Sequence, residues 1–243
     1  PQCKTAAASA TEVFCPRDGA YFVEVADLEA SESDPLLGKR VADFAVVARI
    51  GSGGMGTVYR ALQVGMDRQV ALKVLRAELA DNPQVVQRFL QEAKASAKLQ
   101  HRNLAITYTS GSTPDGLFFI AMEYIPGRSL TQLIERSWVT DPASGHTSYA
   151  LEPARALRLF SQIVSALAHA HRLGIVHRDL KPDNVLIMQD PDEGEQAKVV
   201  DFGIAKLLQS SDGAGNLVKT EANANLGTAL YMAPERFAGA PSD

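Results

Sequence analysis

Acidic, basic and amide side chains that could handle a phosphate group are concentrated in two short stretches of the sequence. Asp179, Lys181 and Asn184 share one stretch, and Asp201 follows a short apolar run. The oxygens of Asn184 and Asp201 suit Mg²⁺, which prefers hard oxygen ligands and keeps positions for phosphate and water. Asp179 can then orient a substrate hydroxyl. This set of residues predicts chemistry on a phosphate group.

A glycine-rich turn lies much earlier, in the run Gly51-Ser52-Gly53-Gly54-Met55-Gly56. Because glycine has no Cβ, such a backbone can close down over phosphates. The same spacing also opens dinucleotide-binding folds, but there a helix follows the glycines directly. Residues 57–61 instead alternate like a strand, which favours a phosphate-covering turn between two strands.

Lys73 and Glu92 form a candidate ion pair between two predicted elements. Lys73 stands in an apolar strand-like run, where a lysine most often extends to solvent. Glu92 falls on the same helical stripe as Val85 and Phe89, so its carboxylate faces inward and needs a cationic partner. A Lys73–Glu92 pair would satisfy both residues. A glutamate at the edge of the stripe is the alternative.

The elements that must position these residues follow from the periodicity of apolar side chains. Alternation predicts strands at 44–50, 57–61, 70–75 and 118–124. Helices are predicted from Pro83, after the capping residue Asn82, and over 153–173, with Gly174 as the stop. Strands dominate the first half and helices the second, which indicates a two-lobed α+β fold. Polar surface loops are expected at 137–151, 189–196 and 209–216.

The composition is that of a globular chain. The 243 residues contain 24 Lys+Arg and 28 Asp+Glu, for a net charge of −4, and 46% are hydrophobic. This balance argues against a nucleic-acid partner. No stretch approaches the roughly 18 apolar residues of a membrane helix, and no secretory signal is visible. We therefore expect a cytoplasmic chain without a membrane segment of its own.

Three regions differ in composition. Residues 1–26 contain both cysteines, residues 27–43 form an acidic segment expected to be a solvated linker, and residues 44–243 carry the regular periodicity. Cys3 and Cys15 each stand where a zinc ribbon would have a pair of cysteines, so residues 1–26 are interpreted as a degenerate ribbon. A structural zinc needs four ligands, and whether these two cysteines bind zinc stays open.

The order of the motifs, closing with the segment 227–235 (Gly-Thr-Ala-Leu-Tyr-Met-Ala-Pro-Glu), resembles the protein-kinase signature set. The residues within these motifs are most similar to those of bacterial serine/threonine kinases of the eukaryotic-like (Hanks) type. The resemblance covers about residues 44–243. It implies a protein-kinase-like fold with a β-rich N-lobe over about 44–125 and an incomplete helical C-lobe over about 126–243.

The resemblance also implies a role for each matching residue, with ATP and Mg²⁺ (or Mn²⁺) as cofactors. Asp179 would be the catalytic base, Lys181 would steady the transferring phosphoryl, Lys73 would contact the α- and β-phosphates while paired with Glu92, and Asn184 and Asp201 would hold the metal. The phosphate-covering loop would comprise Gly51, Ser52, Gly53 and Gly56. Adenine contacts would come from Ile50, Val58, Ala71, Met122 (the gatekeeper), Glu123, Ile125 and Leu186.

The implied activity is transfer of the γ-phosphoryl of ATP to serine and threonine hydroxyls of proteins. Arg178 beside Asp179 suggests control by phosphorylation of the activation loop, with Thr220 as the first candidate acceptor and autophosphorylation within a kinase–kinase dimer as its route. Thr220 as an ordinary loop hydroxyl remains the alternative. Two other function classes are considered. A pseudokinase would bind nucleotide without transfer, and the presence of Lys73, Asp179, Asn184 and Asp201 argues against it. A small-molecule kinase is the other, and the segment 227–235 argues against that class.

The resemblance further leads us to expect that the chain is a fragment, ending soon after Glu235 and weakly active at best on its own. A membrane anchor could follow in the full-length protein. Relatives have further helices after this point, which would cover the stripe of the 153–173 helix formed by Leu157, Phe160, Val164, Leu167 and His171.

Overall fold

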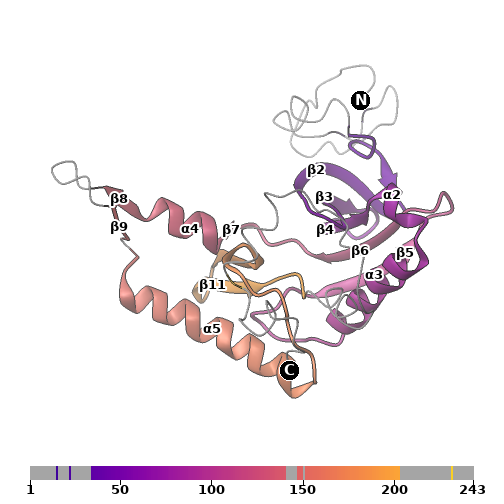
Figure 1. The fold of residues 1–243 in the computed structure, drawn as a ribbon. Coiled ribbons are helices and arrows are strands. Elements are labelled where there is room, and N and C mark those ends of the chain that lie inside the picture. The colour runs from indigo at the N-terminus through magenta and orange to yellow at the C-terminus, as the bar shows by residue number, and fades with distance from the viewer. Residues whose placement is uncertain are drawn as a thin grey trace. The chain divides into compact units, whose positions relative to one another are not determined.

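A computed structural model describes residues 15, 22, 34–140, 147–149, 151–202 and 231 of the chain. The chain divides into two compact units (Figure 1), and each is described by itself. The first comprises Pro1–Ala93 and Thr107–Tyr124, and the second comprises Lys94–Ile106 and Ile125–Asp243.

The first unit is built on a six-stranded antiparallel sheet in the order β1-β2-β3-β4-β6-β5. Its strands are β1 (Arg40–Val41), β2 (Phe44–Ser52), β3 (Gly56–Gln63), β4 (Arg68–Leu75), β5 (Thr107–Ser112) and β6 (Phe118–Glu123). Two helices follow β4 along the chain, the short α2 (Ala77–Ala80) and the longer α3 (Pro83–Ser96). The predicted strands and the helix from Pro83 are confirmed.

The sheet is held by apolar side chains because alternate residues of each strand point to opposite faces. One cluster gathers the buried residues Phe44, Tyr59, Leu72 and Phe119 with their neighbours. A second cluster joins Phe89 of α3 to the sheet through Leu75 and Ile120. α3 begins where predicted, since the Asn82 side chain accepts hydrogen bonds from the backbone N–H groups of residues 84 and 85.

The second unit combines helices with two small antiparallel sheets. One sheet has the order β11-β10-β7 and the other pairs β8 with β9. The elements are β7 (Arg128–Ser129), α4 (Leu130–Arg136), β8 (Trp138–Thr140), β9 (Thr147–Tyr149), α5 (Pro153–Arg172), the 3₁₀ turn η1 (Pro182–Asn184), β10 (Val185–Asp190) and β11 (Gly194–Val199). Gly174 ends α5 with a φ of 70°, as expected for a helix stop.

The core of the second unit lies between α5 and the β10–β11 hairpin. α5 contributes Leu159, Ile163, Ala166 and Ala170, while Leu157, Phe160 and Val164 are exposed and Leu167 is half-buried. The buried residues of α5 therefore lie one position or more away from the apolar stripe that the sequence pattern indicated on this helix. Small alanines form half of it, so their burial leaves little trace in an apolar pattern.

Two segments expected to be polar loops contain strands. Within 137–151, β8 and β9 pair in register, with Trp138 opposite Tyr149. Within 189–196, the end of β10 and the start of β11 form a hairpin, and Gly194, the first residue of β11, has a φ of 78°. The expected loop at 209–216 lies outside the described residues. No helix in the described part of the chain is long and apolar enough to cross a membrane.

Candidate active site

The glycine-rich turn joins β2 to β3 in the first unit. Gly51 lies opposite Val58 and Ser52 opposite Thr57, and the N–H of Gly53 donates to the carbonyl of Gly56 at 2.9 Å. A Cβ on Gly56 would lie 2.3 Å from the carbonyl oxygen of Val74, so packing within the sheet already requires this glycine. A Cβ on Gly51 would meet nothing within 4 Å. Packing within the protein therefore does not explain Gly51, whereas a ligand approaching the turn would.

The ion pair between Lys73 of β4 and Glu92 of α3 is present. Lys73 Nζ lies 2.8 Å from Glu92 Oε1, and the two side chains are 12% and 8% exposed. Phe89, one turn earlier on α3, is fully buried and fixes the inward face of the helix. Glu92 is thus not a glutamate at the edge of the stripe. The pair holds the ammonium group of Lys73 in a defined place.

The register of the sheet aligns several residues that the resemblance assigns to nucleotide binding. Lys73 lies opposite Val58 on one side, and Ala71 lies opposite Met122 on the other. Of the remaining implied adenine contacts, Ile50 is exposed and Glu123 is half-buried in the first unit, whereas buried Ile125 and half-buried Leu186 belong to the second. Their roles in binding stay predictions.

The segment of the second unit that contains the predicted base Asp179 is closed by hydrogen bonds between its own residues. The Asn184 side-chain amide donates to the carbonyl of Asp179 at 2.8 Å, and the Asn184 N–H donates to the carbonyl of Lys181 at 2.9 Å. The N–H of Val200 then donates to the carbonyl of Asn184 at 2.9 Å. This chain of bonds connects the segment containing Asp179 to the residue that precedes Asp201.

His177 completes the same connection from inside the unit. Its Nε2 lies 3.0 Å from the carbonyl oxygen of Val200, which can only accept, so Nε2 carries the proton. Its Nδ1 accepts the N–H of Asp179 at 3.3 Å. Burial lowers the pKa of His177 below its ordinary value, which keeps the imidazole neutral and this tautomer in place. The ring also packs against Phe202, with ring centroids 4.6 Å apart.

Two residues of this region have backbone conformations that side chains rarely adopt. Arg178 has a φ of 61° and Asp201 a φ of 53°, and neither is a glycine. Such conformations cost free energy and persist where the surrounding structure enforces them, which is most often at functional sites. The hydrogen bonds made by His177 and Asn184 provide that enforcement here.

The donor set fits the predicted magnesium site. The nitrogen of the Asn184 side chain is used toward Asp179, so its Oδ1 is the atom left for a cation. With the Asp201 carboxylate it supplies the hard oxygen ligands that Mg²⁺ prefers. Lys181 Nζ lies 4.0 Å from Asp179 Oδ2, which puts a positive charge next to the predicted base.

Sequence reasoning missed residues that hold this region in place. A Cβ on Gly127 would lie 2.2 Å from the carbonyl oxygen of Ile187, so only glycine lets the chain pass β10 here. Gln162 of α5 accepts from the Asn103 side chain at 2.9 Å and from the N–H of Ala197 at 2.8 Å. The Pro126-Gly127 pair was a detectable turn signal. The partners of Gln162 are 59 and 35 residues away, so no local pattern indicates them.

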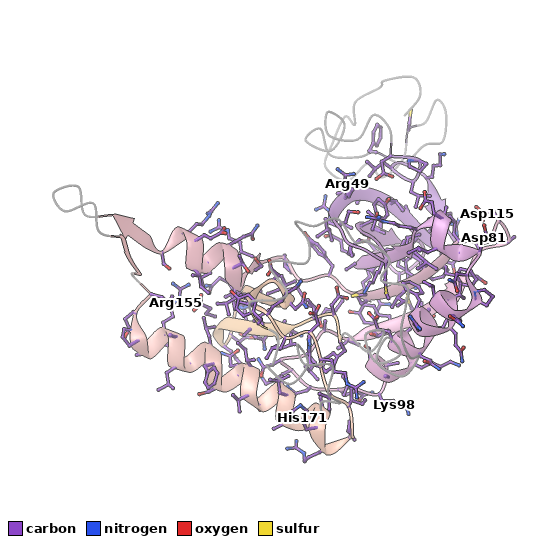
Figure 2. The ribbon with its side chains drawn as sticks, viewed as in Figure 1. Arg49, Asp81, Lys98, Asp115, Arg155 and His171 are labelled. Carbon is purple, nitrogen blue, oxygen red and sulfur yellow. The ribbon has the colours of Figure 1, made fainter. Side chains whose placement is uncertain are left out.

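Arg155 adds a second anchor between α5 and β11. Its guanidinium, at the start of α5 (Figure 2), donates two hydrogen bonds to Glu195, at 2.8 and 2.5 Å. The same contact lowers the pKa of the Glu195 carboxyl and raises that of Arg155. β11 leads directly into Val200 and Asp201, so α5 supports the strand that delivers the predicted metal ligand.

Several predicted residues cannot be located. The phosphoacceptor candidate Thr220, the segment 227–235 apart from Tyr231, and Cys3 lie outside the described residues. Cys15 is fully buried. Within 34–140, 147–149 and 151–202, no three His, Cys, Asp or Glu side chains gather in a way that could hold a metal ion.

Comparison with known proteins identifies the class to which this fold and these residues belong. The protein kinase domain family matches residues 44–243, and the chain belongs to that family. It is 41% identical over 217 residues to the serine/threonine-protein kinase pkn3 of Myxococcus xanthus, covering 89% of this chain and 37% of that protein. It is 39% identical over 205 residues to the serine/threonine-protein kinase PrkC of Bacillus subtilis, covering 84% and 28%.

Solved structures agree with the sequence relatives. The kinase domain of Mycobacterium tuberculosis PknI, as a C20A and R136N double mutant, superposes with a TM-score of 0.58 at 28% identity, covering 84% of this chain and 69% of that one. The resemblance to bacterial serine/threonine kinases and the two-lobed α+β fold are confirmed. The chain spans about a third of the length of the two curated relatives described above.

Proposed function

We propose that this chain is the catalytic domain of a protein kinase that transfers the γ-phosphoryl of ATP to serine and threonine hydroxyls of proteins. The observation that carries the proposal is the buried Lys73–Glu92 pair, at 2.8 Å in the first unit. A buried lysine held by a glutamate is a fixed positive charge, as phosphate recognition requires. The relatives, which are named serine/threonine-protein kinases, support the choice of acceptor.

In the proposed reaction, the substrate hydroxyl oxygen bonds to the γ-phosphorus while the bond from that phosphorus to the β–γ bridging oxygen breaks. The hydroxyl proton passes to Asp179, and ADP leaves. Lys181, 4.0 Å from Asp179, stabilises the charge on the transferring group. Lys73 orients the α- and β-phosphates. Phosphoryl transfer depends mostly on such positioning and charge neutralisation.

Asn184 and Asp201 are proposed to hold Mg²⁺ with ATP, and Mn²⁺ can take its place. The metal would neutralise charge on the phosphate oxygens. The chain's own contribution is to fix the two ligands. The Asn184 amide is oriented by the Asp179 carbonyl, and Asp201 follows Val200, whose backbone is held by His177 and Asn184. ATP is a cytoplasmic substrate, so we propose that the domain works in the cytoplasm.

The direct experiment incubates the full-length gene product with labelled ATP and Mg²⁺, alone and with a generic basic protein, and maps the phosphorylated sites. We expect phosphoserine and phosphothreonine. Asp179→Asn serves as the matched control and should slow transfer by about 10²–10⁴-fold. Label appearing on tyrosine alone, or on an added aminoglycoside and no protein, would contradict the proposal. Nucleotide binding without any transfer would identify a pseudokinase.

Regulation by autophosphorylation between two copies of the kinase is part of the same proposal. Arg178 beside the predicted base is the charge that a phosphate on Thr220 would pair with. We expect Thr220→Ala to lower the rate after both proteins are fully dephosphorylated and then preincubated with ATP. A rate equal to that of the unsubstituted protein would remove Thr220 from the mechanism.

A further inference from the structure

Asp34, in the segment expected to be a solvated linker, is a buried carboxylate with several partners. Its side chain is only 6% exposed. The Tyr59 hydroxyl donates to it, 3.1 Å from Oδ1 and from Oδ2, and the N–H of Leu36 donates to Oδ1 at 3.1 Å. Arg49 Nη1 lies 4.0 Å from Oδ2. A buried carboxylate is tolerated only with such donors, so the segment is fixed at this residue.

The residues after Asp34 are attached to the same sheet. Leu36 and Leu37 pack against the core cluster that contains Tyr59. The N–H of Gly38 donates to the carbonyl of Val46 at 3.0 Å, and the N–H of Val46 donates to the carbonyl of Lys39 at 2.9 Å. The prediction of a solvated linker is therefore wrong for residues 34–41: Arg40 and Val41 form β1 of the sheet, and the residues before them are bound to it.

The two partners of Asp34 on the sheet flank the glycine-rich turn. Arg49 of β2, labelled in Figure 2, lies opposite Tyr59 of β3, and the next pair in the register is Gly51 with Val58. The register shifts by a bulge between Arg49 and Gly51. Side chains alternate along a strand, so Tyr59 faces away from the side on which Val58 is predicted to contact adenine. Asp34 thus connects Arg49 and Tyr59, the residues that form the base of the turn, on the face of the sheet opposite to Val58.

We propose that Asp34 is a positioning residue for the nucleotide: by bridging Tyr59 and Arg49 it fixes the base of the glycine-rich turn in the conformation that covers the phosphates. The inference rests on the proposed function only for the identity of the ligand. A bulge is a place where a ladder can shift, and this one lies between the Arg49–Tyr59 pair and Gly51–Val58, the first pair of the turn. Burial and the Asp34 carboxylate raise the pKa of Tyr59 to about 12, so the phenol remains a donor at neutral pH.

The chain offers a matched control a few residues away. Asp43 lies in the same part of the first unit and pairs with Arg40 at 3.0 Å, but its side chain is 74% exposed. Asp43→Asn removes an exposed acidic charge from the same region without touching the turn. Tyr59→Phe removes the hydroxyl that donates to Asp34 and keeps the ring in the core.

The experiment measures the KM for ATP and kcat of the full-length gene product carrying Asp34→Ala, Tyr59→Phe, both substitutions, or Asp43→Asn. We expect the KM for ATP to rise about tenfold for each of the first two, the change that about 1.4 kcal/mol corresponds to. We expect kcat to change much less and the double variant to resemble the single ones, because both act through one bridge. Asp43→Asn should leave KM and kcat unchanged.

Hydrogen exchange of the backbone amides of residues 51–57 provides a second readout that does not depend on activity. We expect faster exchange there in Asp34→Ala and Tyr59→Phe, with β4 unaffected. An unchanged KM and unchanged exchange in a folded Tyr59→Phe would overturn the inference, even where Asp34→Ala fails to fold. Absence of ATP binding by the unsubstituted protein would instead refute the proposed function, and the exchange result would still test the bridge.

Discussion

Replacing Lys73 separates the structural from the chemical contribution of its ion pair with Glu92. Lys73→Met leaves the Glu92 carboxylate, 8% exposed, without the ammonium group 2.8 Å away. Removing one partner of a buried pair costs about 3–5 kcal/mol, a large part of the 5–15 kcal/mol typical of a domain. At about 2–4 °C for each kcal/mol in a chain of this size, the melting temperature should fall by roughly 6–20 °C. Transfer should be lost as well.

A second substitution divides the two effects. Replacing a buried pair by apolar side chains of similar size is often neutral, so Lys73→Met with Glu92→Leu should regain most of the lost stability. It should not regain activity, because no positive charge is left for the phosphates. Thermal melting and a phosphoryl-transfer assay on the same preparations measure both. The surface pair of Arg102 and Glu193, whose side chains are 53% and 52% exposed, is the control: Arg102→Met should hardly change the melting temperature.

Two outcomes would refute this reasoning. An unchanged melting temperature in Lys73→Met would mean that the buried pair contributes nothing to stability. Transfer at a tenth of the unsubstituted rate or more, in either Lys73 variant, would remove the assigned contact with the phosphates.

The remaining predictions concern the second unit. Asp179→Asn should slow transfer by about 10²–10⁴-fold, the scale for a lost acid–base group, and leave nucleotide binding unchanged. Asp201→Asn should instead weaken Mg²⁺-dependent nucleotide binding. The same binding defect in both variants would contradict the separate roles of base and metal ligand. Gly127→Ala should lower the melting temperature, because its Cβ would lie 2.2 Å from a carbonyl oxygen, and a melt equal to the unsubstituted protein would count against the close approach. The lowered pKa of His177 makes the unfolded state take up its proton first. Stability should therefore fall as the pH drops below about 6.5, and less steeply in His177→Phe than in a control substitution at the exposed His171.

The parts of the fold that the sequence predicts well are those with a local signal. The strands that became β2, β3, β4 and β6 show two-residue alternation, and α3 has a capping residue and a proline at its start. Lys73 and Glu92 could be paired because Glu92 falls on the inward stripe of a periodic helix and needs a cationic partner. The order of the site residues along the chain was identified from the resemblance to the protein-kinase signature set.

Other features depend on partners that are distant in sequence. Asp34 stands in a segment whose acidic composition indicates solvent exposure, and its main partner, Tyr59, is 25 residues away. The inward stripe of α5 relies on Ala166 and Ala170, which are small enough to pack closely but weak as apolar signals. The β8–β9 hairpin consists of two three-residue strands within a polar stretch, too short for alternation to register.

The region around the predicted base shows why short motifs and the surrounding fold have to be considered together. Arg178 and Asp201 hold positive φ values of 61° and 53°, which an isolated peptide of the same sequence would not retain. His177 enforces them by joining the Asp179 N–H to the Val200 carbonyl, and it can do so only as the neutral tautomer that its burial favours. Burial of the His177 imidazole thus fixes the backbone conformations of both Arg178 and Asp201. The chemistry proposed for Asp179 and Asp201 therefore depends on a histidine that is itself buried.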